Sequence, residues 1–394
     1  MRRLSANYIF PVKSGPLKNG IVEIGDNGRI LNIIDTGGEL KETRNLEFYN
    51  GIIVPGFVNT HCHLELSVLK DVLPEKSGLT GFIEQMIDYR ENRISEQSIS
   101  AIEMADELMY SNGIVAVGDI VNTNLSIETK LQSKIFSHSF IEISGLGKDY
   151  KQRFEKAKIL NSEFSERKLS SSIVPHAPYS VSKNLFELIK KEALINNSIL
   201  SLHNQESKEE NEMFLKGSSN LLNLFKTAGI DVSFWKKSGQ SSIETVLDYL
   251  PANNHLLFVH NIYTTPKEIK KVMELFPNSF WVLCPLSNIF IENKLPEIDF
   301  FLDYSDKISL GTDSLASNKL LSILAEMKTI HKEYPHIRFN SLLKWATING
   351  AKALKIDDQY GSLENGKQPG LNLITNFDFQ EMQVTSQSRI KRLV

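Results

Sequence analysis

The sequence predicts an α/β protein, a (β/α)8 TIM barrel with a small β-sandwich-like domain formed by both chain ends. From residue 55 to 359, short apolar strands alternate with longer helical stretches, as in parallel βαβ units. In residues 1–54, short apolar runs alternate with Gly, Asn and Asp turns, and residues 360–394 return to this antiparallel pattern. A length of 394 residues suits one large barrel with a small accessory domain.

Eight apolar segments give the number of strands that a (β/α)8 barrel needs. In chain order they are residues 56–63, 113–120, 134–143, 169–178, 198–204, 255–261, 279–285 and 307–314. Between them, residues 79–93, 95–113 and 318–334 repeat apolar side chains every three or four positions. This spacing is typical of helices that cover the outside of a barrel.

Composition narrows the class of function. With 41% hydrophobic and 23% charged residues, the chain is typical of a soluble globular protein, and its net charge of −3 indicates neither nucleic acid nor an anionic membrane as partner. Two cysteines, Cys62 and Cys284, exclude a disulfide framework. The N-terminus lacks the apolar core of a signal peptide, and no stretch has the length of a membrane span. We therefore expect a cytoplasmic protein that acts on a small molecule.

Polar side chains collect where the predicted strands end, which is where barrels of this kind place their active sites. They are His61, His63, His176, His203, His260 and Asp313. Three neutral imidazoles and one carboxylate bind zinc or ferrous iron and leave one position open for water. Such an ion lowers the pKa of its bound water to about 7. Each histidine alone could equally be a hydrogen-bonded core residue, so the prediction rests on the ordered series.

Glu206 follows His203 by three residues, close enough in a turn after the strand to reach the same pocket. A carboxylic acid beside the metal could shuttle protons. The alternative is a glutamate that caps the helix beginning in this charged segment.

The motifs PGFVNTHCHLE, HAPYS, LHNQE, VHN, CPLSN and GTDSLASN resemble, in this order, those of the amidohydrolase superfamily. The resemblance covers nearly the whole chain and is strongest to the deaminase and chlorohydrolase branch, which includes cytosine, guanine and adenosine-derivative deaminases. It implies that one metal ion is bound by His61, His63, His203 and Asp313.

The same resemblance assigns roles to the remaining residues. Glu206 would protonate a ring nitrogen of the substrate, and His260 would hold or polarise the attacking water. Asp313 would also relay a proton to the leaving amine, and His176 would contact the substrate. Members with two metals carry a carbamylated lysine at the end of the fourth strand, and the segment SSIVPHAPYS has no lysine there. One ion is therefore expected, zinc first and iron as the alternative, in a homo-oligomer such as a dimer.

Two longer stretches, residues 63–90 and 214–235, resemble the subgroup of aminodeoxyfutalosine deaminases. That substrate carries an adenine-type base and a benzoate, and a carboxylate favours a bidentate arginine. Arg90, Arg93 and Arg153 are the candidates, and each could instead be an exposed helix residue. A chlorohydrolase or another amidohydrolase acting on a triazine- or pyrimidine-like substrate stays as the enzymatic alternative, and a non-catalytic barrel scaffold as the other.

Overall fold

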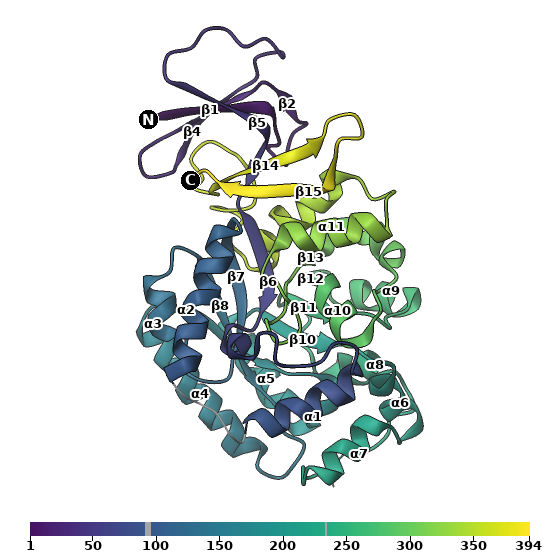
Figure 1. The fold of residues 1–394 in the computed structure, drawn as a ribbon. Coiled ribbons are helices and arrows are strands. Elements are labelled where there is room, and N and C mark those ends of the chain that lie inside the picture. The colour runs from purple at the N-terminus through teal and green to yellow at the C-terminus, as the bar shows by residue number, and fades with distance from the viewer. Residues whose placement is uncertain (91–95, 233–234) are drawn as a thin grey trace.

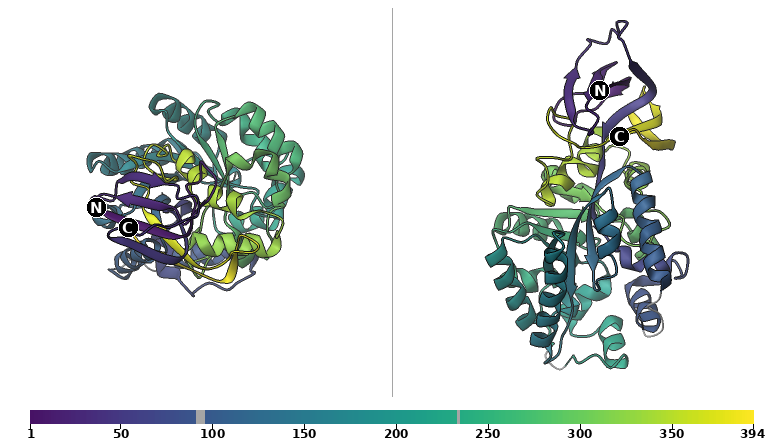
Figure 2. Two further views of the ribbon diagram at one scale, coloured as in Figure 1. Left: turned by 90° about the horizontal axis from the view of Figure 1, so that it is seen from above. Right: turned by 90° about the vertical axis from the view of Figure 1, so that its left-hand side faces the viewer.

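A computed structural model describes residues 1–90, 96–232 and 235–394, and only the backbone of residues 88–90 and 96. The molecule has two parts: a small β sheet that contains both chain termini, and a larger α/β body below it (Figure 1). Figure 2 shows from two further sides that helices surround the strands of the larger body.

The eight predicted barrel strands all form in the expected order. They are β6 (Phe57–Cys62), β7 (Ile114–Val121), β8 (Phe136–Ile143), β9 (Ser170–Pro175), β10 (Leu200–Asn204), β11 (Leu256–His260), β12 (Ser279–Leu283) and β13 (Ile308–Leu310). They pair in parallel as two four-stranded sheets, β6-β7-β8-β9 and β10-β11-β12-β13.

The two sheets adjoin at both of their edges. Cys62 and Asp313 form an isolated parallel bridge beside β6 and β13, and the His203 amide donates to the His176 carbonyl across the other edge at 2.9 Å. Within the described residues the strand pairing stops at these two edges, so the fold is α/β and a fully closed eight-stranded barrel stays a prediction.

The helices follow the strands and pack on the outside of the body. They are α1 (Gly78–Arg90), α2 (Glu96–Ser111), α3 (Ile127–Gln132), α4 (Tyr150–Glu166), α5 (Lys183–Asn196), α6 (Lys208–Lys216), α7 (Asn220–Thr227), α8 (Ser242–Val246), α9 (Pro266–Leu275), α10 (Pro285–Glu292), α11 (Ile323–Glu333), α12 (Phe339–Ala346) and α13 (Ile348–Ala353). Short 3-10 helices are η1 (Leu64–Leu69), η2 (Pro178–Ser180), η3 (Leu247–Tyr249) and η4 (Ile298–Lys307).

The three helices predicted from their apolar spacing correspond to α1, α2 and α11. The third begins later than predicted, because Ser322 caps it: the Ser322 hydroxyl accepts the amide of Ala325. Among the helices of the described residues, none is long and apolar enough to cross a lipid bilayer.

The small sheet joins the two chain ends, as predicted. Its strands are β1 (Arg2–Ile9), β2 (Leu17–Lys18), β3 (Ile21–Ile24), β4 (Ile30–Ile34), β5 (Leu46–Pro55), β14 (Leu371–Asp378) and β15 (Gln383–Arg392). They pair in the order β15-β14-β5-β1-β3-β4, with β2 on β1. Because this pairing gives one seven-stranded sheet, a sandwich-like shape and the boundaries 1–54, 55–359 and 360–394 remain predictions.

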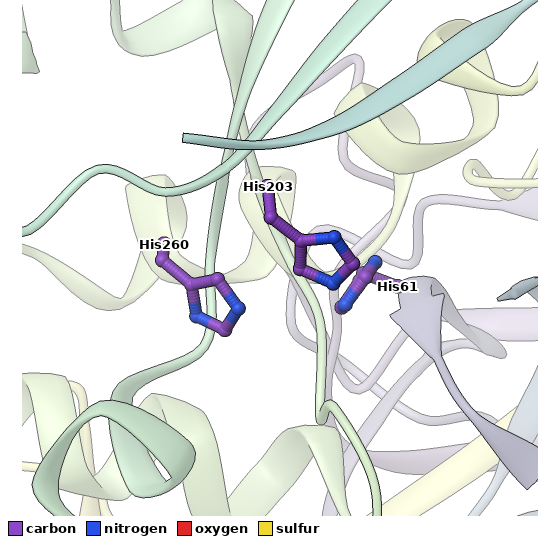
Figure 3. Close-up of side chains that lie close together, drawn as sticks. All are labelled: His61, His203 and His260. Carbon is purple, nitrogen blue, oxygen red and sulfur yellow. The ribbon is translucent and has the colours of Figure 1, made fainter. Parts of the chain in front are cut away.

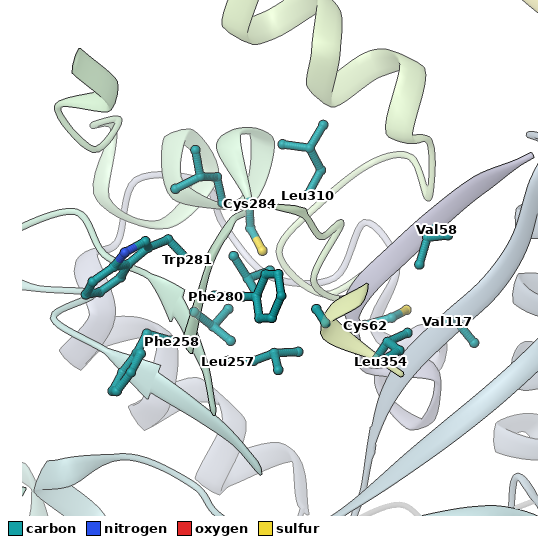
Figure 4. Close-up of a cluster of buried hydrophobic side chains, with 14 of the residues drawn as sticks. Val58, Cys62, Val117, Leu257, Phe258, Phe280, Trp281, Cys284, Leu310 and Leu354 are labelled. Carbon is teal, nitrogen blue, oxygen red and sulfur yellow. The ribbon is translucent and has the colours of Figure 1, made fainter. Parts of the chain in front are cut away.

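Side chains from both four-stranded sheets meet in one core (Figure 4). Val58 and Val117 come from the first sheet, and Leu257 and Phe280 from the second. This shared apolar interior holds the two sheets together. It also contains both cysteines, and burial raises the pKa of each thiol well above its ordinary value. The cysteines are therefore packing residues.

Candidate active site

The carboxyl ends of the strands bring the predicted site residues together. His61 belongs to β6, and its carbonyl accepts the amides of Thr312 and Asp313 at 3.0 and 3.1 Å. These bonds fix the loop after β13 against the first strand. His260 ends β11, and both His260 (φ 74°) and Asp313 (φ 55°) have left-handed backbone conformations. Such conformations are costly for residues other than glycine and concentrate at functional sites.

Four of the donor atoms have spacings that suit one metal ion. The Nε2 atom of His63 lies 3.2 Å from Nε2 of His61 and 3.2 Å from Nε2 of His203. Oδ1 of Asp313 lies 3.6 Å from Nε2 of His61 and 3.4 Å from Nε2 of His63. Donor atoms at about 2.1 Å from a zinc ion and at tetrahedral angles are about 3.4 Å apart. These four of the six donor–donor spacings therefore fit a zinc-sized ion.

Hydrogen bonds behind the cluster orient these donor atoms. The Nδ1 atom of His203 donates to the His176 carbonyl at 2.9 Å, which leaves its Nε2 lone pair facing the cluster. The hydroxyls of Ser287 and Ser317 both donate to Oδ2 of Asp313 at 2.6 Å, so its Oδ1 is left for the histidines.

The electrostatics favour ligands in the form that binds a cation. Burial lowers the pKa of His61 to about 3 and that of His63 well below its ordinary value, so both rings are neutral at pH 7. Burial alone would raise the pKa of Asp313, but the surrounding histidines hold it well below its ordinary value. Neutral imidazoles and an ionised carboxylate are the states that coordinate metals.

His260 and Glu206 lie beside this cluster. Figure 3 shows the rings of His61, His203 and His260 gathered from three different elements. The Nδ1 atom of His260 donates to Oδ1 of Asn288 at 2.8 Å, and its Nε2 lies 3.7 Å from Oε1 of Glu206. Burial raises the pKa of Glu206 to about 8, so at pH 7 this side chain carries a proton that it can donate.

Glu142, near the end of β8, is a site residue that sequence reasoning missed. Its Oε1 lies 3.4 Å from Nδ1 of His203, and its side chain is 8% exposed. The signal in the sequence was one charged residue inside the apolar segment FSHSFIEI. Ser287 and Ser317 were not singled out either, although they lie within the motifs CPLSN and GTDSLASN.

A cavity of about 680 Å³ opens onto these residues. His63, His203, Glu206, His260 and Asp313 line its inner end, together with Glu142 and His176. The Nδ1 atom of His176 lies 2.6 Å from the Ser180 hydroxyl. The remaining lining includes the apolar residues Leu79, Phe82, Ile83, Phe225 and Ile291, together with the charged residues Lys148, Asp149, Arg153 and Asp231. The cavity can therefore accept a polar reacting group at its inner end and a larger apolar portion beyond it.

Of the three arginines predicted to bind a substrate carboxylate, the structure describes the side chain of one, Arg153. Arg153 lines the cavity, where its Nε donates to Oδ2 of Asp149 at 2.7 Å and its Nη1 to the Ser144 carbonyl at 3.3 Å. Arg90 is the last residue of α1, and its side chain lies outside the described part of the structure. Arg93 also lies outside the described residues.

A histidine–carboxylate cluster at the strand ends of an α/β body is typical of metal-dependent hydrolases. The model of the Amidohydrolase family matches residues 52–388, so the chain belongs to this family. It is accordingly a hydrolase that acts on C–N bonds, in a superfamily whose members typically depend on a divalent metal.

Similar proteins share most of the chain. An adenosine deaminase of Helicobacter pylori is 28% identical over 359 residues, covering 88% of this chain and 84% of the relative. An aminodeoxyfutalosine deaminase of Nitratiruptor is 24% identical over 339 residues, covering 82% and 79%. The crystal structure of Helicobacter pylori aminofutalosine deaminase with methylthio-coformycin has a TM-score of 0.82 at 23% identity and covers 100% of both chains. An adenosine deaminase structure from Xanthomonas campestris with bound zinc has a TM-score of 0.72 at 21% identity, covering 98% and 87%.

Proposed function

We propose that this protein is a single-metal hydrolytic deaminase of an adenine-type nucleoside, with aminodeoxyfutalosine as the candidate substrate. The observation that carries the proposal is the buried Glu206, whose Oε1 lies 3.7 Å from Nε2 of His260, beside the cluster of His61, His63, His203 and Asp313. The names of the adenosine and aminodeoxyfutalosine deaminases among its relatives support the same reaction.

His61, His63, His203 and Asp313 would hold the ion, for which we propose zinc, with iron as the alternative. When bound, such an ion polarises the substrate and supplies an activated water at neutral pH. The spacings of about 3.4 Å expected for tetrahedral ligands support this assignment of the four residues.

The protein groups would move the protons. Glu206 donates its proton to the ring nitrogen next to the amino-bearing carbon, which makes that carbon open to attack by water. Asp313 takes one proton from the attacking water and passes it to the amino group, which leaves as ammonia. The second water proton returns to Glu206. The C–N bond is thereby replaced by C=O, and His260 orients the water through its inward-facing Nε2.

The outer cavity supports a nucleoside with a large substituent. Its apolar wall would cover the substituent, and Arg153 at the rim offers a charge for a carboxylate such as benzoate. Arg90 and Arg93 stay candidates for the same contact. His176, at the inner end, would contact the base or sugar. A homodimer also stays a prediction.

Ammonia release by purified protein of known metal content tests the proposal. The panel would contain adenosine, methylthioadenosine, aminodeoxyfutalosine and a chlorotriazine, with chloride measured for the last. We expect ammonia from the nucleosides and the highest kcat/KM for aminodeoxyfutalosine. Chloride release without deamination would support the chlorohydrolase alternative, and one metal per chain without any turnover would support the scaffold alternative.

A further inference from the structure

An ion pair lies buried behind the site, between Asp119 in β7 and Lys130 in α3. Nζ of Lys130 is 2.6 Å from Oδ2 of Asp119, and the side chains are 1% and 0% exposed, respectively. The lysine also donates to the Ser139 hydroxyl at 2.9 Å and lies 5.2 Å from the centre of the Phe164 ring. A buried ion pair contributes little net stability, because desolvation offsets the attraction between the charges. This pair therefore calls for a role besides stability.

The second oxygen of Asp119 reaches the site. Its Oδ1 accepts the amide of Leu64 at 2.8 Å, and Leu64 directly follows His63. The next residue, Glu65, is also bound to the end of β7: its carboxylate accepts the amides of Asn122 and Thr123 at 3.0 and 3.1 Å. The two residues after His63 are thus both held against β7 by carboxylates.

His63 needs such support because it lies outside the strand. β6 ends at Cys62, and His63, with φ −128° and ψ 86°, precedes the first turn of η1. The His61 carbonyl is fixed by the amides of Thr312 and Asp313, whereas none of the strand pairs among the described residues includes His63. Its Nε2 must nevertheless stay 3.2 Å from Nε2 of both His61 and His203. The peptide group that joins His63 to Leu64 is fixed by Asp119 instead.

We propose that Asp119 is a positioning residue for His63, acting through the Leu64 amide, and that Lys130 is the partner that balances its buried charge. The inference rests on the proposed metal centre, since it treats His63 as a ligand. It adds a residue from β7, a strand that contributes none of the proposed ligands.

Two double variants separate positioning from stability in the full-length protein. Asp119→Asn with Lys130→Met removes both charges but keeps a side-chain oxygen for the Leu64 amide. Asp119→Ala with Lys130→Met removes both charges and the acceptor. After the metal is stripped, Zn²⁺ affinity is measured by competition with a chelator, the Co²⁺ absorption spectrum is recorded, and Tm is measured.

We expect the alanine double variant to bind Zn²⁺ about 10- to 100-fold more weakly than the wild type, with a changed Co²⁺ spectrum. The asparagine double variant should keep nearly wild-type affinity and spectrum even where its Tm falls. Equal affinities for the two double variants would overturn the proposal. If the alanine double variant does not fold, Asp119→Leu with Lys130→Met fills the space and also lacks the acceptor, so the same loss is expected.

Lys367→Met is the matched control. It breaks an ion pair of 2.7 Å with Glu364, remote from the site, and should lower Tm without changing Zn²⁺ affinity. Failure of the wild type itself to bind metal would reject the proposed centre. Tight binding by the wild type and by the alanine double variant would reject only the role of Asp119.

Discussion

His61 in β6 and His138 in β8 are both buried imidazoles on parallel strands, and burial lowers the pKa of each to about 3. Their neighbours differ. Nδ1 of His138 lies 2.7 Å from the Ser170 hydroxyl and its Nε2 lies 2.9 Å from the Ser172 hydroxyl. Nε2 of His61 instead faces Nε2 of His63 at 3.2 Å.

This difference separates a core histidine from a proposed metal ligand. A serine hydroxyl can donate or accept, so two of them satisfy a neutral imidazole completely. Ring nitrogens whose lone pairs face each other, as those of His61 and His63 do, repel unless a cation or a proton lies between them. The atoms around both ring nitrogens therefore distinguish the two roles, whereas burial and pKa do not.

The largest effect is expected when a proposed ligand is lost. His203→Ala should lose the bound metal and reduce turnover by more than about 10⁴-fold, because both the activated water and the site geometry depend on the ion. Metal analysis and ammonia release check this. His138→Gln, which keeps hydrogen bonding to the serines, should retain the metal. Loss of metal in both variants would contradict the distinction between a core histidine and a metal ligand.

Glu206→Gln should reduce kcat by about 10²- to 10⁴-fold while metal content and Tm stay unchanged. The amide cannot give its proton to a ring nitrogen, although its shape is nearly that of the acid. Steady-state kinetics with metal analysis measure the effect. Near-wild-type kcat in this variant would remove Glu206 from the mechanism.

Arg153→Met compares the rim of the cavity with its inner end. We expect KM for aminodeoxyfutalosine to rise about 3- to 10-fold, a modest effect because the arginine is half-exposed and already paired with Asp149. KM for adenosine, which has no carboxylate, should not change. An equal rise for both nucleosides would mean that the arginine shapes the rim without binding the carboxylate.

The last prediction concerns stability instead of activity, and it is a pH dependence at His138. Its pKa is about 3 in the folded protein and about 6.5 when unfolded, so between these values the unfolded chain binds the extra proton. Its contribution therefore falls as pH decreases from 6.5 toward 3, by at most about 1.4 kcal/mol per pH unit. Denaturant unfolding of the wild type should show a steeper loss over this range than His138→Gln. Equal slopes would contradict the assignment of a neutral core histidine.

Much of this arrangement could be predicted from the sequence. Parallel strands end at one edge, so His61, His63, His203, His260 and Asp313 could be expected together, although β6 ends at Cys62 and His63 does not share the strand with His61. In the structure, donor atoms of His61, His203 and His260 lie within 4.8 Å of one another, and so do those of His61, His63 and Asp313.

The supporting residues could not be predicted in the same way. Ser317 lies four residues after Asp313, but Ser287 comes from α10, and only the folded chain shows that both donate to the same oxygen. Asp119 and Lys130 lie on different elements, and their joint burial depends on how α3 packs against the sheet. The contacts at the edges of the two sheets also join residues that are distant in the sequence, so local sequence patterns do not predict them.

The bonds from Thr312 and Asp313 to the His61 carbonyl have a consequence for biosynthesis. They join residues about 250 positions apart, and closing so long a loop has an entropic cost that delays such contacts during folding. A nascent chain that has emerged only as far as β12 has three of the four proposed ligands but lacks both the carboxylate and the amides that hold His61 in place. Tight metal capture would therefore mark the completion of the body, and an immature chain would compete poorly for the cell's supply of metal.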